Sequence, residues 1–465
     1  MGFEELSEKE RAKAIAEAVE VHESSGHVIA EAEQRSYYDT DNPDIAKRKK
    51  VYASVRDCDG SSDLGAFEAV AKENRFAANE KVASSFFRDI TDQKVQYLAG
   101  EGADVNPVSD SDADAVAAVF APLKRQLRRQ GQACLTDALV YRCGYAYLQV
   151  INGRLMLSHV PYSEVIPSYG LTGELVAVVR HWKRGKREFA EYHTPDKVYA
   201  FEKVERQGGN AEWVQTEERW QIQTVTLYGD GTVQASGGKG WARIPWFEMR
   251  HNNDGTSSLT NAVKTMIRCY DIVVSDFANN LIDVQDVFVK LKQGYGSGME
   301  YGETLEMMRL FKAAEDVEDV QTVDVPYMAR ETLLTRLKAS IYQALRGVDL
   351  DRIAAGSTNT ATAIRALYSD IDLWADQAEW HMEDWVLDIL QTAADYMGVQ
   401  LPEVNVTFTR RLIFDEVAQM DAVARQKGVI SDKTLFENHP LVDDAQAELE
   451  RVAAQDLDAA YSGEL

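Results

Sequence analysis

The amino-acid sequence predicts an α+β protein that is mainly helical, with a β-rich module and a small α/β insert between long helices. Three observations support this fold class. Several segments carry apolar residues at helical spacing, the longest of them over residues 360–397. Residues 146–249 contain short β-rich runs separated by Gly and Asn turns. The chain has 465 residues, well above the roughly 300 at which one hydrophobic core stops growing, so we expect two or more packed regions.

The N-terminal part is expected to be helical. Residues 6–36 are rich in Ala, Glu and Lys at helical spacing, and the Thr-Asp-Asn-Pro turn at residues 40–43 ends this helix. A second helix is predicted over residues 79–98, because Gly100 stands where a C-cap glycine belongs. A third is predicted over residues 113–142. The β-rich module that follows has its clearest runs at residues 147–151, 175–182, 223–228 and 244–249.

Residues 257–283 predict a long amphipathic helix with N-cap candidates at its start. Its apolar residues step by threes and fours along one side: Leu259, Val263, Met266, Tyr270, Val273, Phe277 and Leu281. Its other side is polar: Lys264, Arg268, Asp271, Ser275, Asn279 and Asp283. Such a narrow stripe suits a helix that packs against neighbours, including copies of itself, while the polar flank faces water. An ordinary amphipathic core helix has the same periodicity, and the pattern does not separate the two.

The insert at residues 284–326 follows this helix. Strands are predicted at 287–291 and 320–325, with a Gly-rich loop and a short helix at 304–314 between them. A second amphipathic helix covers residues 327–346 and precedes an irregular segment at 347–359. The helix of residues 360–397 would extend about 57 Å, which implies an elongated subunit. A strand is expected at 404–409, and acidic helices at 414–464.

Composition restricts the class of protein. The formal charge of −25 argues against a chain that grips nucleic acid tightly, because affinity for DNA comes mainly from Lys and Arg residues that neutralise phosphates. Acidity that serves only solubility is the alternative interpretation. No apolar run reaches the roughly 18 residues needed to span a bilayer, and the acidic first ten residues do not resemble a secretory signal. Four scattered cysteines favour reduced thiols over a disulfide or zinc framework.

The sequence contains none of the common catalytic motifs. A phosphate-binding G-x-x-x-x-G-K-[ST] loop, an H-E-x-x-H metal motif and a G-x-S-x-G elbow are all missing. The run Gly237-Gly238-Lys239-Gly240 has no Ser or Thr after its Lys, and we interpret it as a hairpin turn. His22 and His27 are five residues apart on a predicted helix, which does not suit joint ligation of a metal. We therefore expect no catalytic residues, cofactor or metal.

Several short blocks, in this order along the chain, carry a resemblance to a known family. They are Tyr37-Tyr38, Asn74-Arg75-Phe76-Ala77-Ala78-Asn79, Tyr97-Leu98-Ala99-Gly100, Gly144-Tyr145-Ala146-Tyr147 and, most specifically, Ser275-Asp276-Phe277-Ala278-Asn279-Asn280. Residues 159–167, 430–434 and 442–451 add to the pattern. The blocks resemble the portal proteins of tailed bacteriophages, in the branch typical of long-tailed phages of Gram-positive hosts. One departure is Ser357-Thr358-Asn359-Thr360-Ala361, where that family tends to have Ser-Gly-x-Ala.

The resemblance implies a dodecameric ring at the unique capsid vertex, which conducts double-stranded DNA during packaging and genome ejection. It would assign residues 1–256 and 360–411 to a wing, 257–283 and 327–346 to a stem, 284–326 to a clip, 347–359 to a tunnel loop and 412–465 to a short crown. The implied partners are the terminase large subunit, a head-completion adaptor, and the major capsid and scaffolding proteins. The implied location is the virion, and the host cytoplasm during assembly. Another homo-oligomeric ring adaptor of a virion, or an acidic α/β enzyme with a site not evident in the sequence, are the alternatives.

Three groups of residues are the candidate functional sites. The tunnel loop would face the DNA and is expected to be mobile, because its glycines relax the backbone: Gly347, Asp349, Arg352, Gly356, Ser357 and Asn359. Basic residues of the second stem helix could steady the DNA or serve only solubility: Arg336, Lys338 and Arg346. An acidic set in the clip could attract basic partners: Glu300, Glu303, Glu306, Glu315, Asp316, Glu318 and Asp319.

Overall fold

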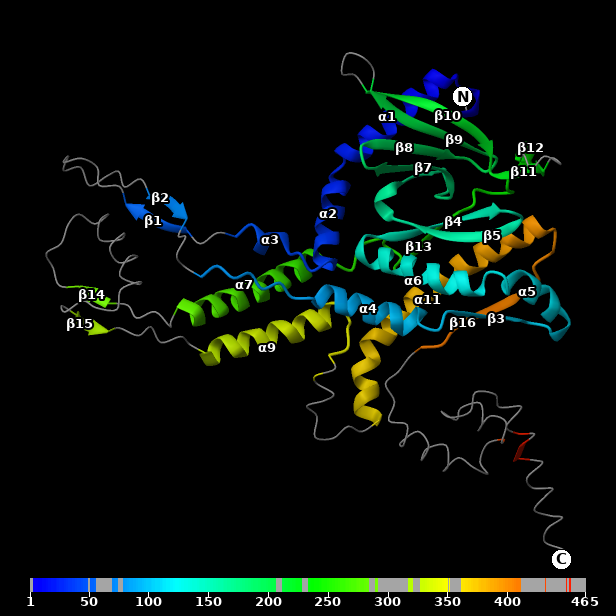
Figure 1. Cartoon of the computed structure of the whole chain (residues 1–465). Coiled ribbons are helices and arrows are strands. Elements are labelled where there is room, and N and C mark those ends of the chain that lie inside the picture. The colour runs from blue at the N-terminus through cyan, green and yellow to red at the C-terminus, as the bar shows by residue number, and fades with distance from the viewer. Residues whose placement is uncertain are drawn as a thin grey trace, which may run out of the picture.

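A computed structural model shows an α+β architecture, in which helices pack under two antiparallel sheets and a pair of helices projects from one side (Figure 1). The structure describes residues 3–48, 51–55, 69–73, 78–205, 211–227, 233–283, 289–291, 317–320, 327–349, 351, 361–410, 431, 449 and 451–452. The predicted fold class is confirmed in its coarse form, as a mixture of helices and sheets.

The helices are α1 (Glu8–Ser24), α2 (Gly26–Tyr38), α3 (Pro43–Ala46), α4 (Phe86–Ala99), α5 (Ala113–Phe120), α6 (Lys124–Val140), α7 (Asn261–Asp283), α9 (Tyr327–Ala344) and α11 (Ala361–Met397). The strands are β1 (Val51–Val55), β2 (Ala69–Glu73), β3 (Ala103–Pro107), β4 (Cys143–Ile151), β5 (Arg154–Val160), β6 (Val165–Tyr169), β7 (Leu175–Arg184), β8 (Arg187–His193), β9 (Lys197–Glu205), β10 (Ala211–Trp220), β11 (Ile222–Leu227), β12 (Val233–Lys239), β13 (Trp246–Arg250), β14 (Val289–Leu291), β15 (Val317–Val320) and β16 (Val404–Phe408).

The β-rich module consists mainly of two antiparallel sheets. One has the strand order β10-β9-β8-β7-β6 and the other the order β13-β4-β5. Helix α1 packs on the five-stranded sheet, where buried Ile15 and Val19 meet Tyr199 and Phe201. Two-stranded pairings join β1 to β2, β11 to β12, β14 to β15, and β16 to β3. The predicted β-rich region is thus confirmed, and its alternating apolar residues supply the cores on both sides of the module.

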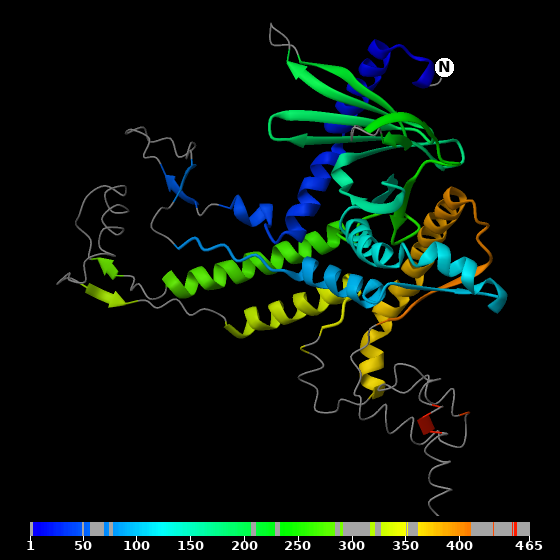
Figure 2. The ribbon, with the colours of Figure 1, turned by 45° about the vertical axis from the view of Figure 1, so that its right-hand side comes forward.

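The largest core lies around α11. Its buried face includes Ile371 and Ile389, and it packs with Leu98 of α4, Val119 of α5 and Leu135 of α6. Burial of a side chain of this size contributes roughly 1.5–3 kcal/mol, so this cluster is a main source of stability. Figure 2 shows α11 passing behind the shorter helices towards β16. The prediction of one helix over residues 360–397 is confirmed.

Helices α7 and α9 run side by side and project from the rest of the fold (Figures 1 and 2). At the base of the pair, Val263 and Ile267 of α7 and Ile341 of α9 are buried with Ile90 of α4. Towards the far end the apolar residues are exposed, and Met328 is 75% accessible. None of the helices in the described ranges is long and apolar enough to cross a membrane.

An extended segment, residues 80–84, is bound along α7 by a row of polar side chains. Asn279 accepts a hydrogen bond from the Glu80 N–H at 2.7 Å and donates to the Glu80 carbonyl at 3.1 Å. The Ser275 hydroxyl bonds both backbone groups of Val82. This row, called the polar ladder below, continues at Asp271.

At its third rung, Asp271 Oδ1 accepts from the Ser84 N–H at 3.0 Å and Asp271 Oδ2 accepts from Asn42 Nδ2 at 2.8 Å. The spacing explains the fit, because four helical residues advance about 6 Å and two extended residues about 6.7 Å. Asp271, Ser275 and Asn279 are 1%, 3% and 2% exposed. The expectation that this polar flank faces water was therefore wrong at these three positions.

Three predicted helices have different limits in the structure. The helix expected over residues 6–36 is divided into α1 and α2 at Ser25, which has extended dihedral angles. The helix expected over 113–142 is divided into α5 and α6, because Pro122 between them has no N–H to donate. The helix expected from residue 79 begins only at Phe86, since residues 80–84 lie extended on α7. The predicted helix at 304–314 lies outside the described residues.

We predict that the polar ladder stabilises the fold measurably. Changing Asn279 to Leu leaves the N–H and carbonyl of Glu80 without a buried partner, which should reduce the free energy of unfolding by about 2 kcal/mol. Asn280 is next along the helix and partly exposed, so Asn280→Leu provides the matched control. Chemical denaturation followed by circular dichroism measures both. Equal effects of the two substitutions would contradict the role of the ladder.

Candidate functional site

The chain leaves the projecting pair through a tight turn after α9. Arg346 has a φ of 53°, and the Gly347 N–H donates to the Tyr342 carbonyl at 2.9 Å. A Cβ atom on Gly347 would lie 2.7 Å from Cγ2 of Ile90 in α4, so only glycine permits this close approach. The turn is therefore fixed against α4.

The residues after the turn are also held. The Val348 N–H donates to Gln93 Oε1 at 2.8 Å, and Gln93 Nε2 donates to the Val348 carbonyl at 3.0 Å. Lys338 Nζ lies 3.3 Å from Asp349 and 2.5 Å from Asp351. Mobility was expected for the whole of residues 347–359, and for residues 347–349 the structure shows an anchored backbone instead. Four of the candidate residues lie outside the described residues: Arg352, Gly356, Ser357 and Asn359.

The three basic candidates on and after α9 differ in their surroundings. Arg336 is exposed on the helix surface. Hydrogen bonding to Asp351 raises the pKa of Lys338, and Asp349 adds to the effect, so this lysine is charged but its charge is balanced within the subunit. Arg346 is exposed in the turn. Of the three, Lys338 is the least suited to bind a phosphate, because two carboxylates already compete for it.

The acidic candidates of the insert are only partly described. Glu318 and Asp319 lie in β15, which pairs antiparallel with β14, and Asp319 stands opposite Lys290. The structure has a strand at residues 317–320; of the strand predicted over 320–325, only Val320 lies within the described residues. The other candidates of this set lie outside the described residues: Glu300, Glu303, Glu306, Glu315 and Asp316.

Two buried basic residues, Lys94 and His251, lie beside the turn. The Lys94 ammonium sits 4.9 Å from the ring centre of Trp374, and the residue is 4% exposed. Burial lowers the pKa of Lys94 to about 7, and the charge of Arg346 adds to this. His251 is also buried there, and burial lowers its pKa to about 4.

The hydrogen bonds of His251 fit a neutral ring. Its Nε2 lies 2.9 Å from the Thr256 carbonyl, which requires a proton on that nitrogen. Its Nδ1 accepts from the Trp374 indole N–H at 3.5 Å, which requires a lone pair on the other. His251 thus joins the loop before α7 to α11 as a neutral structural residue.

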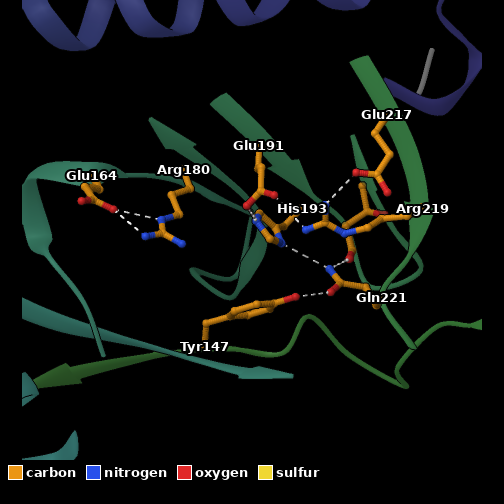
Figure 3. Close-up of polar contacts among 9 residues, drawn as sticks. Tyr147, Glu164, Arg180, Glu191, His193, Glu217, Arg219 and Gln221 are labelled. Atoms are coloured by element: carbon orange, nitrogen blue, oxygen red, sulfur yellow. Dashed lines mark hydrogen bonds and ion pairs between the residues drawn. The ribbon is translucent and has the colours of Figure 1, made fainter. Parts of the chain in front are cut away.

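A second buried network connects the two sheets of the β-rich module (Figure 3). Tyr147 of β4 donates to Gln221 Oε1 at 2.8 Å, and Gln221 Nε2 lies 3.5 Å from Nδ1 of His193 in β8. Glu191 lies 3.4 Å from His193 Nε2 and accepts from Arg219 at 2.8 Å. Burial alone would raise the pKa of Glu191, yet His193 and Arg219 lower it to about 2.

This network has the residue types of an acid–base site but the arrangement of a structural one. Glu191 is held between a histidine and an arginine, so it stays ionised and is a poor proton acceptor. His193 is 1% exposed, and burial lowers its pKa. Within the described ranges, no group of three or more His, Cys, Asp or Glu side chains is placed to hold a metal ion. The network binds one sheet to the other.

The residues that organise this region carry no distinctive signal in the sequence. Gln93 and Lys94 lie on the helix predicted over 79–98, where they look like ordinary surface residues. The signal that could have revealed the ladder is the spacing of Asp271, Ser275 and Asn279, three polar residues of small or medium size at steps of four. Solvated helix faces show the same spacing, so the pattern alone carries little information.

Comparison with known proteins adds independent information. Residues 32–460 match the family described as phage portal protein, SPP1 Gp6-like. The chain is 22% identical over 408 residues to the portal protein of Clostridium phage phiCD119, covering 79% of this chain and 83% of that protein. It is 23% identical over 453 residues to the portal protein of Bacillus phage SPP1, covering 90% of this chain and 81% of that protein.

We predict that buried Lys94 destabilises the fold at neutral pH. Its pKa is lowered from 10.5 to about 7, so between these values the unfolded chain binds a proton that the folded chain does not. Lys94→Met should raise the free energy of unfolding by a few kcal/mol at pH 7, and the gain should shrink towards pH 10. Denaturation of both proteins across this range measures it. A gain that is absent, or independent of pH, would contradict the assignment.

Proposed function

Because the chain belongs to the SPP1 Gp6-like family of phage portal proteins, we propose that it forms the ring at the unique capsid vertex through which double-stranded DNA is packaged and ejected. A dodecamer is the proposed subunit number. The protein acts as a structural component of the virion, and its task is to let DNA pass and to hold other proteins.

The observation that supports a ring best is the projecting pair α7 and α9. Its base is buried in the subunit, whereas apolar side chains near its far end are exposed in the single chain: Leu281, Ile282, Tyr327 and Met328. Exposed apolar residues in such numbers favour contact with another surface. Copies arranged about a closed axis would cover these residues on every subunit.

We assign the projecting pair to the stem and residues 284–326 to the clip. Residues 347–359 form the tunnel loop in this proposal, with residues 347–349 as its anchored start. Residues 1–256 and 360–411 form the wing and 412–465 a short crown. The net charge of −25 suits a channel in which DNA slides, because bound phosphates would slow its passage. Arg336 and Arg346 are the basic candidates most available to DNA, since both are exposed and neither takes part in an ion pair between described residues.

The clip is the proposed docking surface for the terminase large subunit and for a head-completion adaptor. Its acidic residues would attract basic surfaces of these proteins. The wing is the proposed contact for the major capsid and scaffolding proteins. We propose the assembled virion as the site of action and the host cytoplasm as the place of assembly.

We predict that the purified protein forms rings with a central hole, visible by negative-stain electron microscopy. Met328→Asp should weaken assembly, because it places a charge among the exposed apolar residues of the stem. Leu171→Asp makes the same change at a fully exposed loop position and serves as the control. Light scattering measures the mass. A stable 52.0 kDa monomer of the unmodified chain at micromolar concentration would contradict the proposal.

We also predict that the part of the tunnel loop after its anchor is needed for DNA movement. Gly356→Pro restricts the backbone there and should leave rings intact while it reduces packaging of DNA into proheads. Gly347 is unsuited to this test, because its N–H and its contact with Ile90 are part of the fold. Packaging at the unmodified level would remove the loop from the proposed mechanism.

A further inference from the structure

Helix α11 carries an exposed apolar line on the side opposite its core. Leu373 and Trp380 are 63% and 68% exposed, and they are seven residues apart, so they lie on one face. Asp376 and Asp384, one turn before and after Trp380, are also exposed. Asp376 is paired with Arg410 at 2.6 Å within the subunit, whereas Asp384 takes part in none of the ion pairs between described residues. This surface, the α11 face, combines a large aromatic ring with negative charge.

Helix α6 carries a surface of the opposite character. Arg125 and Arg129 are exposed and lie one turn apart. Their neighbours Lys124 and Arg128 pair with Asp104 at 3.3 Å and Glu101 at 3.8 Å. Arg125 and Arg129 take part in no ion pair between described residues. These two arginines form the α6 face, a basic surface whose charge is not balanced within this part of the chain.

Helices α6 and α11 pack against each other, and the two faces lie on opposite sides of this helix pair. Helices α6 and α11 meet at Gly131, where a Cβ atom would lie 3.5 Å from the ring of Trp385 (Figure 1). Since each helical residue turns by about 100°, Arg129 lies about 160° around α6 from Gly131. By the same geometry, Trp380 lies about 140° around α11 from Trp385. The α6 face and the α11 face are therefore exposed on opposite sides of the α6–α11 pair.

We propose that the α11 face of one subunit docks on the α6 face of a second copy of this chain. The arrangement is head to tail, because the two surfaces differ and lie on opposite sides, and this is the geometry that closes into a ring. Trp380 would lie against the guanidinium group of Arg125 or Arg129, which favours an aromatic face. Asp384, one turn along, would pair with the other arginine, because both pairs have the spacing of one helical turn.

Charge complementarity favours a second copy of this chain over nucleic acid as the partner of these two faces. The α11 face is acidic and would repel DNA, so nucleic acid does not explain its exposed tryptophan. The arginines of the α6 face could bind the phosphate backbone of a nucleic acid. A nucleic acid bound there would leave the α11 face uncovered. A copy of the chain covers both surfaces at once. The pairing presupposes the ring proposed above.

The test is a charge exchange between the two faces. Chains with Arg125→Glu and Arg129→Glu should need about tenfold more protein to assemble, because two like-charged surfaces then meet. Adding Asp384→Arg, together with Glu383→Arg at the partly exposed carboxylate beside it, reverses the charge of the other side as well. Assembly should then recover in part, because the ion pairs are restored with opposite signs while Trp380 no longer meets a guanidinium group. Arg184→Glu with Lys186→Glu makes the same charge change at an exposed hairpin of the five-stranded sheet and is the control. Mass photometry over a dilution series gives the ring fraction, and thermal unfolding confirms that each variant is folded.

The possible outcomes distinguish an error in the proposed contact between the α6 and α11 faces from an error in the proposed ring. Failure of the unmodified chain to form rings would overturn the proposed function. Normal rings from the Arg125→Glu, Arg129→Glu chain, at the same concentration as the control, would overturn the pairing and leave the ring standing. The pairing is also overturned if the chain reversed on both faces stays folded but does not recover, or if the arginine changes weaken binding of a DNA duplex and leave assembly unchanged.

Discussion

Hydrogen bonds from helix side chains to extended backbone are the interaction on which the rest of this structure depends. In the polar ladder, Asp271, Ser275 and Asn279 supply residues 80–84 with the partners that a neighbouring strand would normally supply. A buried backbone N–H or carbonyl without a partner costs about 1–3 kcal/mol. Each of these hydrogen bonds therefore stabilises the observed position of the segment relative to positions in which the bond is lost. The segment lies between β2 and α4 in the chain, and its fixed path along α7 sets where α4 begins.

Helix side chains also hydrogen-bond to extended backbone at two other places. Gln126 and Gln130 of α6, one turn apart, bond backbone groups of Leu155, Leu157 and His159 along the outer edge of β5. Gln93 of α4 bonds both backbone groups of Val348 after α9. Edge strands left open invite pairing with other chains, and covering them with helix side chains prevents this. The exposed apolar and charged faces of the helices are then the surfaces left for association.

Much of the fold follows from local patterns in the sequence. The apolar steps of α7 and α11 and the alternating runs of the β-rich module are strong signals, because burial of one face is what forms these elements. The ends of the helices were harder to predict. Pro122 divides α5 from α6 within one predicted helix. The helix predicted from residue 79 begins later because the residues before it bind α7, almost two hundred residues away in the chain. The buried state of Asp271, Ser275 and Asn279 could not be predicted, since periodicity does not reveal what lies opposite a polar stripe. The resemblance to portal proteins indicated the family, but it carried no information on Gln93, Lys94 or Trp380.

Hydrogen exchange at single-residue resolution tests the central role of the polar ladder most directly. Residues 80–84 lie on α7 with alternate amides bonded to its side chains, so the N–H groups of Glu80, Val82 and Ser84 should exchange slowly. Those of Lys81 and Ala83, between the rungs, should exchange quickly. This alternation is the expected result in the assembled protein. Uniformly fast exchange over residues 80–84 would contradict the account, because the segment would then not be held by α7.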